Sequence, residues 1–421
     1  MAAASAESKS KVVIVGGGVM GLCTAYYLCK QGIPVTLLEM GDVGNGASLG
    51  NAGYVSPSHF VPLAAPGVFA QGLKWMFNPT SPLYIKPRLD WDFLVWTAHF
   101  ARACDARHVE RAVPVLRDLL VEAQGLYEEM FAAGHGRCDY TKHGLTLLFK
   151  TDKARARAEH EVEWAGKIGM TARMVDAAGL AAMDPGVEFE AHGGAHFPHD
   201  AHMVPAELVA SLAVDVTRMG AQIERNCRLE RWERSGNRIV RIVTNRGTFA
   251  ADEFVLATGA WSPQLLRDTG IRMLLQAGKG YSITYANPPR KPLLPYLLME
   301  SRVAVTPFPH GLRFAGTMEI AGVSTTINRP RVEAILNAIP RYFRNLPRPD
   351  SAQGEIWGGM RPVTPDGMPY IGRFRKAPNL IAATGHAMVG LSLAPVTGKI
   401  VAELIAGGPQ RDLRLLSPDR F

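Results

Sequence analysis

The amino-acid sequence predicts an α/β fold with a second, mixed α+β unit inserted into it, and three observations support this prediction. A β-branched run, a glycine cluster, a helical stretch and a second β-branched run follow one another within residues 12–39. Strand and helix patterns of the same kind return at 203–257 and again at 380–407. The stretches between them differ, because they are rich in prolines and aromatic residues or in strands and turns.

Composition limits the class of protein. The chain has 421 residues, of which 47% are hydrophobic and 20% charged, so it is neither a disordered nor a fibrous chain. At about 150 residues per domain, this length predicts two or three domains. The net charge of +8 is compatible with a nucleic acid, an anionic membrane, an anionic substrate or simple solubility. No nucleic-acid-binding motif is present, so we expect no nucleic-acid partner.

The first element is a strand over 12–15, whose valines and isoleucine are typical of a buried parallel strand. It runs into Gly16-Gly17-Gly18-Val19-Met20-Gly21, which fits G-x-G-x-x-G, and a helix over 22–31 and a strand over 35–39 follow. This is a Rossmann-like βαβ unit.

Each glycine of the motif has a physical role. Gly16 makes the tight turn, Gly18 lets the backbone approach a pyrophosphate, and Gly21 packs the helix on the strand. The N-terminus of the helix that follows supplies free N–H groups and a partial positive charge, which favour phosphates. A glycine-rich turn without a ligand is the alternative, and the agreement of motif, context and the following acid disfavours it.

Glu39 is an acidic residue at the position where a Rossmann-like βαβ unit binds the ribose of its nucleotide. Glu39 ends the second strand, at about the 20-residue distance at which a carboxylate holds ribose hydroxyls, and Met40 follows it. This carboxylate disfavours a 2′-phosphate and therefore NADP. The choice between FAD and NAD stays open at this point.

The later elements continue the pattern. We expect a helix over 109–134, a strand over 144–149, two helical segments within 152–183 and a helix over 205–220. Strands are predicted at 222–224, 239–244, 254–257 and 380–383, with a helix near 330–344 and a last helix that ends near Gly407.

These elements predict a nucleotide-binding domain that is contributed by separate pieces of the chain. We assign residues 11–58, 190–265 and 355–421 to it, residues 59–189 and 266–354 to a substrate or cap domain, and residues 1–10 to a disordered tail.

Two strand ends carry Thr-Gly, in Ala257-Thr258-Gly259-Ala260-Trp261-Ser262 and in Ala383-Thr384-Gly385-His386. The second precedes the last helix, and Gly390-Leu391-Ser392 would supply amide groups at its start. A reduced flavin carries negative charge at its pyrimidine end, and a helix N-terminus stabilises such charge. This arrangement favours a flavin.

Several segments together resemble the D-amino-acid oxidase superfamily of FAD-dependent amine oxidoreductases. They are the opening GGGVMG with Glu39, the segment ASLGNAG at 47–53, ATGAWS at 257–262, GMRPVTPDGMP at 359–369 and Thr384-Gly385-His386. The region 51–77 is similar to the D-amino-acid dehydrogenase branch, which includes D-hydroxyproline dehydrogenases. The resemblance covers nearly the whole chain and implies a D-amino-acid oxidase-like two-domain architecture, with a Rossmann-like FAD-binding domain and an inserted mixed α+β substrate domain.

The resemblance also implies a set of cofactor-binding residues. Around the ADP half they are Gly16, Gly18, Val19, Met20, Gly21, Glu39 and Met40, with Leu229 touching the adenine through its backbone. Around the flavin they are Ser48, Asn51, Ala52, Gly53, Gly259, Gly385, Met388, Gly390, Leu391 and Ser392. Some relatives attach the flavin to a cysteine after the last Thr-Gly. No cysteine stands there in this chain, so non-covalent FAD is expected.

Three residues are the catalytic candidates. Arg361, in the G-x-R-P motif, matches an arginine that clamps the substrate carboxylate in related amine oxidases. Tyr281 is a candidate donor to the same carboxylate, and His386 is a candidate for tuning the flavin charge or relaying a proton. The alternatives are a surface arginine, a core tyrosine and a structural histidine. A further arginine of glycine-oxidase-like relatives is replaced by Met388, which argues against their substrate.

The resemblance implies oxidative deamination of D-amino acids, including D-proline or hydroxy-D-proline, by hydride transfer from the substrate Cα to flavin N5. The product is an imine, and the electrons go to a quinone-type or other acceptor. Two alternatives stay open: an amine or amino-acid oxidase that uses O₂, and a non-catalytic flavin-binding electron relay.

Localisation and other ligands are less constrained. The five cysteines have no CxxC spacing, and no apolar run is long enough to span a bilayer. We therefore expect a cytoplasmic protein, and a peripheral position on the inner face of the cytoplasmic membrane stays open. The aromatic-rich stretch 69–96 is either domain core or a surface that contacts a membrane or a quinone-linked acceptor. The histidine-rich stretch 192–202 is interpreted as a turn or domain interface, with no metal site expected.

Overall fold

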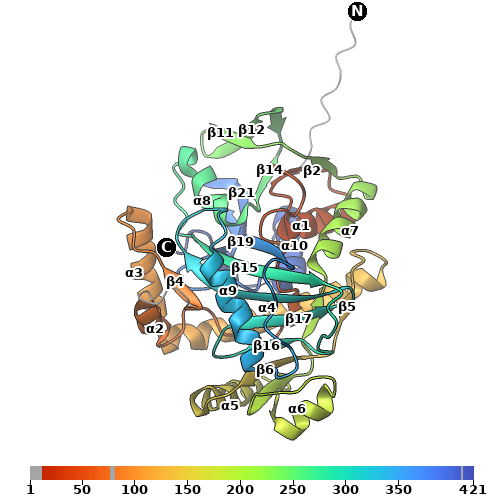
Figure 1. Ribbon diagram of the computed structural model, residues 1–421. Coiled ribbons are helices and arrows are strands. Elements are labelled where there is room, and N and C mark those ends of the chain that lie inside the picture. The colour runs from red at the N-terminus through yellow and green to blue at the C-terminus, as the bar shows by residue number, and fades with distance from the viewer. Residues whose placement is uncertain (1–11, 76–80, 409–410) are drawn as a thin grey trace, which may run out of the picture.

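The computed structural model describes residues 12–75, 81–408 and 411–421 of the chain (Figure 1). The tail expected at 1–10 lies outside the described residues. Ten α-helices occur among the described residues: α1 (Val19–Lys30), α2 (Val68–Trp75), α3 (Trp91–Ala103), α4 (Ala106–Ala132), α5 (Asp152–Lys167), α6 (Ala177–Met183), α7 (Pro205–Arg218), α8 (Ser262–Leu265), α9 (Arg329–Ala338) and α10 (Gly390–Ala406).

A six-stranded, mostly parallel sheet forms the nucleotide-binding half. Its order is β10 (Gln222–Glu224), β2 (Val35–Leu38), β1 (Val12–Val15), β14 (Glu253–Leu256), β21 (Ala377–Thr384) and β20 (Tyr370–Phe374). β1 lies between β2 and β14 and pairs in parallel with both. The predicted strands at 12–15, 35–39, 222–224, 254–257 and 380–383 are thus confirmed, and they assemble from three distant parts of the chain.

The two faces of this sheet are covered differently. Val12 and Ile14 of β1 pack into a core with α1, α4, α7 and α10, whereas Val13 and Val15 face the opposite side. That side is covered by a three-stranded antiparallel sheet of β11 (Leu229–Ser235), β12 (Arg238–Thr244) and β13 (Gly247–Ala250), seen at the top of Figure 1. All four residues of β1 are buried, which explains why the strand is apolar throughout.

A nine-stranded mixed sheet forms the other half. Its order is β19 (Glu355–Val363), β15 (Gln276–Ala286), β18 (Gly311–Ile320), β17 (Val303–Phe308), β16 (Tyr296–Leu298), β6 (Leu145–Phe149), β8 (Gly193–Phe197) and β7 (Arg173–Asp176), and β4 (Leu83–Ile85) pairs with β18. A small sheet of β3 (Tyr54–Val55), β9 (Ala201–Met203) and β5 (Tyr140–Thr141) completes the strands.

The sheet pairing differs from the domain boundaries that we expected. β8 and β19 fall within the expected nucleotide segments 190–265 and 355–421, yet both belong to the nine-stranded sheet. Conversely, α4 lies in the expected cap segment 59–189 but packs on α10, where the Tyr127 hydroxyl donates to the Leu391 carbonyl at 2.8 Å. Local periodicity does not report which sheet a strand joins, and the expected domain boundaries stay a prediction.

Candidate functional site

The glycine turn between β1 and α1 has the conformation that the motif predicts. Gly16 has a φ of +108°, and a Cβ at this position would lie 2.5 Å from the Ala257 carbonyl oxygen. A Cβ at Gly21 would lie 1.9 Å from the Gly16 oxygen. Larger residues are excluded by backbone atoms, so these two glycines allow the helix, the turn and the β14 end to meet closely.

The start of α1 is prepared for an anion. Gly18 is the residue before the helix, and the Val19 N–H donates to the Ser48 hydroxyl at 3.1 Å. No acidic side chain stands in the first turn, so the partial positive charge of the helix end is not neutralised by its own sequence. Met20 is buried behind it. Ser48 thereby ties the loop after β2 to the helix start.

Glu39 lies beside the glycine turn. Its carboxylate accepts hydrogen bonds from the Gly17 N–H at 2.8 Å and from the Gly41 N–H at 3.0 Å. The neighbouring Met40 is half exposed, at 53%. Leu229 is buried and begins β11. The motif and its acid therefore meet in space.

The two Thr-Gly segments also meet. Gly259 has a φ of +55°, and its carbonyl accepts hydrogen bonds from the hydroxyls of Ser262 at 2.8 Å and Thr384 at 3.1 Å. Gly385 has a φ of +81° and follows Thr384 directly. The ends of β14 and β21 are thereby joined at one edge of the parallel sheet, which is where such sheets bind ligands.

The N-terminus of α10 begins at Gly390, close to this edge. Ser392 is buried, donates to the Tyr54 carbonyl at 3.1 Å and accepts from the Ser56 N–H at 3.2 Å. A Cβ at Gly390 would lie 3.6 Å from Met20 Cε, so the starts of α10 and α1 are neighbours. Leu391 is buried and Met388 is 46% exposed.

His386 is buried in this region and shares a hydrogen bond through Nε2 with the Thr397 hydroxyl at 2.9 Å. Burial lowers its pKa to about 3, so the ring is neutral at physiological pH. This geometry agrees with the structural alternative that the sequence left open. The catalytic reading of His386 stays a hypothesis.

The loop at 48–53 is held by its own glycine and by the nine-stranded sheet. Gly53 has a φ of +87°, its N–H donates to the Asn51 side-chain oxygen at 2.8 Å, and a Cβ there would lie 2.4 Å from the Met203 oxygen. The Ala52 carbonyl accepts from the Thr306 hydroxyl at 2.7 Å, and the Asn51 carbonyl accepts from Arg313 at 2.6 Å.

Sequence reasoning missed the sheet residues that contact this loop. They are Thr306 on β17, Arg313 on β18 and Trp357 on β19. The indole of Trp357 packs so closely that a Cβ at Gly50 would lie 2.0 Å from its Cδ2. No motif surrounds these residues, and only strand pairing brings them to the loop.

Arg361 lies on β19 above a glycine of the adjacent strand. A Cβ at Gly280 would come within 2.0 Å of its Nη1, so the guanidinium occupies the space over Gly280. Nη1 donates to the Thr317 carbonyl at 2.7 Å, and no acidic partner is present among the described residues. Burial lowers the pKa of Arg361 to about 10, which leaves it charged at neutral pH.

The structure does not bring Tyr281 to Arg361, which corrects our expectation of a shared carboxylate contact. Arg361 covers Gly280, and neighbouring residues of a strand point to opposite faces, so Tyr281 faces the other side of the sheet. Its hydroxyl donates to Glu319 at 3.0 Å, and Glu319 pairs with Arg331 at 3.3 Å. Tyr281 is thus a buried core tyrosine.

The histidine-rich segment is taken up by other contacts. His196 shares a hydrogen bond with Thr146 at 2.9 Å, and His202 shares one with the Pro307 carbonyl at 3.0 Å. Burial lowers the pKa of each imidazole to about 4. Within the described parts of the chain, no three His, Cys, Asp or Glu side chains are grouped as metal ligands.

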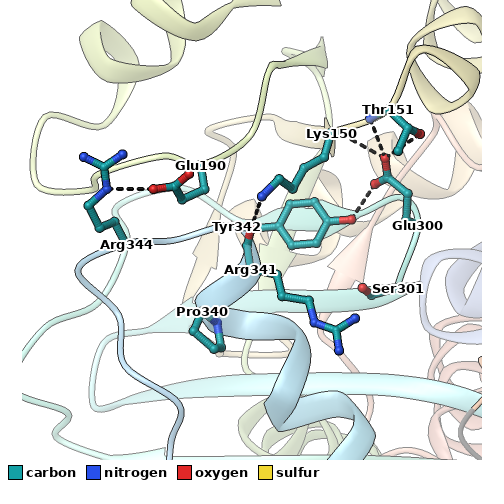
Figure 2. A pocket seen from close by; sticks show the side chains of 9 residues that line it. All are labelled: Lys150, Thr151, Glu190, Glu300, Ser301, Pro340, Arg341, Tyr342 and Arg344. Carbon is teal, nitrogen blue, oxygen red and sulfur yellow. Dashed lines mark hydrogen bonds and ion pairs between the residues drawn. The ribbon is translucent and has the colours of Figure 1, made fainter.

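A separate cavity of about 470 Å³ shares no residue with the expected site (Figure 2). Glu300 in its wall accepts from the Lys150 and Thr151 N–H groups at 2.9 and 3.0 Å, and Arg344 pairs with Glu190 at 2.7 Å. Its carboxylates are therefore already satisfied by the protein, and the cavity lacks a converging set of open donors.

These features define a dinucleotide-binding oxidoreductase of the flavin type. Close-packed glycine turns, an acid beside them and two neighbouring helix starts fit the phosphates and ribose of a dinucleotide. The sequence profile of the family described as FAD dependent oxidoreductase matches residues 11–404. The chain belongs to this FAD-dependent oxidoreductase family, and its cofactor is FAD.

Sequence relatives extend over nearly the whole chain. A D-amino acid dehydrogenase of Rhizorhabdus wittichii is 32% identical and covers 98% of this chain and 100% of its own length. A D-amino acid dehydrogenase of Granulibacter bethesdensis is 31% identical and covers 94% of this chain and 96% of its own length.

Solved structures agree on the fold. Glycine oxidase from Geobacillus kaustophilus superposes with a TM-score of 0.73 at 23% identity and covers 98% of both chains. L-proline dehydrogenase from P. horikoshii has a TM-score of 0.74 at 18% identity and covers 98% of this chain and 97% of its own. These likenesses confirm the D-amino-acid oxidase-like architecture.

Proposed function

We propose that this protein is an FAD-dependent dehydrogenase that oxidatively deaminates D-amino acids. The single observation that carries the proposal is the charged, partly buried guanidinium of Arg361, which lies over Gly280 without an acidic partner among the described residues. A buried cation of this kind is costly unless an anion meets it. The names of the two D-amino acid dehydrogenase relatives support the same substrate class.

The substrate carboxylate is the anion that suits Arg361. One nitrogen, Nη1, is engaged by the Thr317 carbonyl at 2.7 Å, and this contact fixes the guanidinium plane. A guanidinium presents further donors that match a carboxylate in a planar fork. Because Arg361 stays charged with a pKa of about 10, the clamp operates across the neutral pH range.

The cofactor lies, in this proposal, between the two sheets and is held non-covalently. Gly16, Gly18, Val19, Met20, Gly21, Glu39, Met40 and Leu229 hold the ADP half, and Ser48, Asn51, Ala52, Gly53, Gly259, Gly385, Met388, Gly390, Leu391 and Ser392 surround the flavin. No cysteine stands in the segment 385–392 to form a covalent bond. The neighbouring starts of α1 and α10 supply N–H groups for negative charge.

The residues of the chain act mainly by position. FAD, when bound, would supply the acceptor for a hydride from the substrate Cα. Arg361 orients the substrate through its carboxylate, and the nine-stranded sheet excludes water from one side. No strong base is required of the protein, because the substrate amine reacts in its neutral form. Hydride loss leaves an iminium, which releases a proton to water and becomes the imine. The imine then hydrolyses in water to a keto acid.

The test is anaerobic reduction of the yellow protein by a panel of D- and L-amino acids and secondary amines that includes D-proline and hydroxy-D-proline. Bleaching of the flavin by D-amino acids is expected, and its absence across the panel would leave an electron relay instead. Hydrogen peroxide formed at the turnover rate in air would make the protein an oxidase.

Arg361→Met is expected to lower kcat/KM for D-amino acids by roughly 30-fold or more, which corresponds to about 2 kcal/mol, while FAD stays bound. Arg361→Lys retains the charge without the planar fork, so an intermediate value is expected. Arg348→Met is the control, because Arg348 contacts Glu333, Asn337 and the Pro349 carbonyl and none of the proposed site residues. Wild-type kinetics in Arg361→Met would remove the clamp from the proposal.

We also propose that electrons leave to a quinone-type acceptor at a membrane surface. None of the helices in the described part of the chain has the length and apolar character to cross a bilayer. The stretch 69–96 was expected to be either domain core or a membrane-contacting surface, and it contains residues of both kinds. Phe93 and Trp96 are buried, whereas Leu89 is 99%, Trp91 71% and Leu94 46% exposed. Exposed apolar side chains grouped at one helix start favour contact with lipid.

Co-sedimentation with anionic phospholipid vesicles tests this contact. Trp91→Ser is expected to release the protein from the vesicles, whereas Leu293→Ser, at another exposed apolar position, is not. Equal sedimentation of both variants and the wild type would contradict the proposed surface.

A further inference from the structure

Side chains of the nine-stranded sheet bind three carbonyl groups of the 48–53 loop. Nη1 of Arg313 donates to the Leu49 carbonyl at 3.1 Å and to the Asn51 carbonyl at 2.6 Å. The Thr306 hydroxyl donates to the Ala52 carbonyl at 2.7 Å. The sheet thus controls the orientation of three peptide units that lie in the other half of the molecule.

Because the peptide bond is planar, a bound carbonyl also fixes the direction of the N–H group of the next residue. In a trans peptide the carbonyl of one residue and the N–H of the next point in opposite directions. Because Arg313 binds the Leu49 and Asn51 carbonyls, the N–H groups of Gly50 and Ala52 are directed away from it. Neither N–H has a protein partner among the described residues, whereas the Asn51 and Gly53 N–H groups are bonded within the loop.

Arg313 is also placed to strengthen these two donors. It forms no ion pair within the described residues, its Nε donates to the Thr284 hydroxyl at 2.9 Å, and its guanidinium lies 5.0 Å from the centre of the Phe308 ring. Burial lowers its pKa to about 10, so it stays protonated at neutral pH. A cation behind a carbonyl polarises the peptide and makes its N–H a better donor in a site shielded from water.

We propose that Arg313 is a positioning residue that presents the Gly50 and Ala52 N–H groups to the bound flavin and thereby stabilises its reduced, negatively charged form. This inference rests on the proposed position of the flavin beside the 48–53 loop. Preorganised N–H donors of this kind stabilise charge that develops during a reaction. Thr306 supports the same loop through the Ala52 carbonyl.

The experiment measures the flavin reduction potential of the holoenzyme by equilibrium with a redox dye, without any amino acid. Arg313→Met is expected to shift the balance between reduced and oxidised flavin at least tenfold toward the oxidised form, which is about 30 mV for two electrons. FAD affinity, measured by fluorescence titration, is expected to fall as well. A wild-type potential in Arg313→Met would overturn the proposal.

Arg234→Met is the matched control. Arg234 also donates to two carbonyls, of Thr269 and Lys376, each at 2.6 Å, but far along the chain from the loop. Its loss is expected to leave the potential unchanged. A shift equal to that of Arg313→Met would show a general effect of lost carbonyl contacts and would also overturn the proposal.

Two milder variants test the proposed role of Arg313 if Arg313→Met does not fold. Arg313→Lys keeps the charge, so the flavin potential of this variant is expected to lie between that of Thr306→Val and that of the wild type. Thr306→Val removes one hydroxyl and is expected to lower the potential measurably; wild-type values in both variants overturn the inference. Because the dye needs no substrate, a failure to oxidise D-amino acids would count only against the proposed function.

Discussion

The glycine turn at 16–21 and the loop at 48–53 lie at the same edge of the parallel sheet, but different parts of the chain hold them in shape. The turn is shaped by its own βαβ unit, where Gly21 lies against the Gly16 carbonyl and Glu39 binds the Gly17 N–H at 2.8 Å. The loop depends on Thr306 and Arg313, which are more than 250 positions away in the sequence. The first is therefore visible as a motif, and the second is visible only in the tertiary structure.

The largest effect is expected from breaking the glycine turn. Gly21→Ala would place a Cβ 1.9 Å from the Gly16 carbonyl oxygen. Because this obstacle is backbone and cannot move aside, the free energy of unfolding is expected to fall by about 3 kcal/mol or more. Denaturant unfolding measures this. Gly125→Ala, in α4 with nothing within 4 Å of its Cβ, is the control and is expected to stabilise by about 0.5–1 kcal/mol.

A smaller effect is expected from Glu39→Gln. The Glu39 carboxylate now accepts hydrogen bonds from the N–H groups of Gly17 and Gly41. A glutamine amide keeps one acceptor oxygen, and its NH₂ group would face the other N–H without a hydrogen bond. A hydrogen bond to a charged group contributes about 1.5–3 kcal/mol, so FAD affinity is expected to weaken at least tenfold. Fluorescence titration of the apoprotein measures this, and unchanged affinity would separate Glu39 from the cofactor.

A pH dependence is expected next to the second region, where β9 pairs with β3 directly after the 48–53 loop. Asp200, in the turn before β9, accepts from the Ser58 N–H at 3.1 Å, and burial raises its pKa to about 7. The folded state therefore binds this proton more tightly than the unfolded state, whose carboxyl has a pKa of about 3.9. Its contribution to stability is full below about pH 4 and is lost as the pH rises through about 7.

Asp200→Asn is expected to remove this slope, so that stability changes less between pH 5 and 8 than in the wild type. Thermal unfolding at several pH values measures it. An unchanged slope in the variant would assign the pH dependence to other groups.

The smallest effect is expected from Tyr281→Phe, which sharpens the contrast between the two faces of β15. Glu319 would lose the donor that now lies 3.0 Å away and would keep its pair with Arg331. The free energy of unfolding is expected to fall by about 1 kcal/mol, with KM for D-amino acids unchanged. A tenfold rise in KM would return Tyr281 to the substrate site.

Much of the nucleotide-binding half was predictable, because its signals are local. The strand at 12–15, the glycine spacing and the acid at Glu39 constrain one another within a short stretch, and the Thr-Gly strand ends repeat the pattern. The domain boundaries stay a prediction, and the packing differs from them where β8 and β19 join the nine-stranded sheet and α4 packs on α10. Strand partners and helix docking depend on residues far away, which periodicity does not report.

The sequence by itself determined the fold class and the cofactor type, and it singled out Arg361 as the candidate substrate contact, which stays a prediction. The tertiary structure decided which side chains share a surface with it. Alternation along β15 turns Tyr281 away from Arg361, and the pairing of β17, β18 and β19 brings Thr306, Arg313 and Trp357 to the 48–53 loop. The physical reason is that a motif records backbone constraints between near neighbours, whereas the face of a sheet is set by register and by strands from distant parts of the chain.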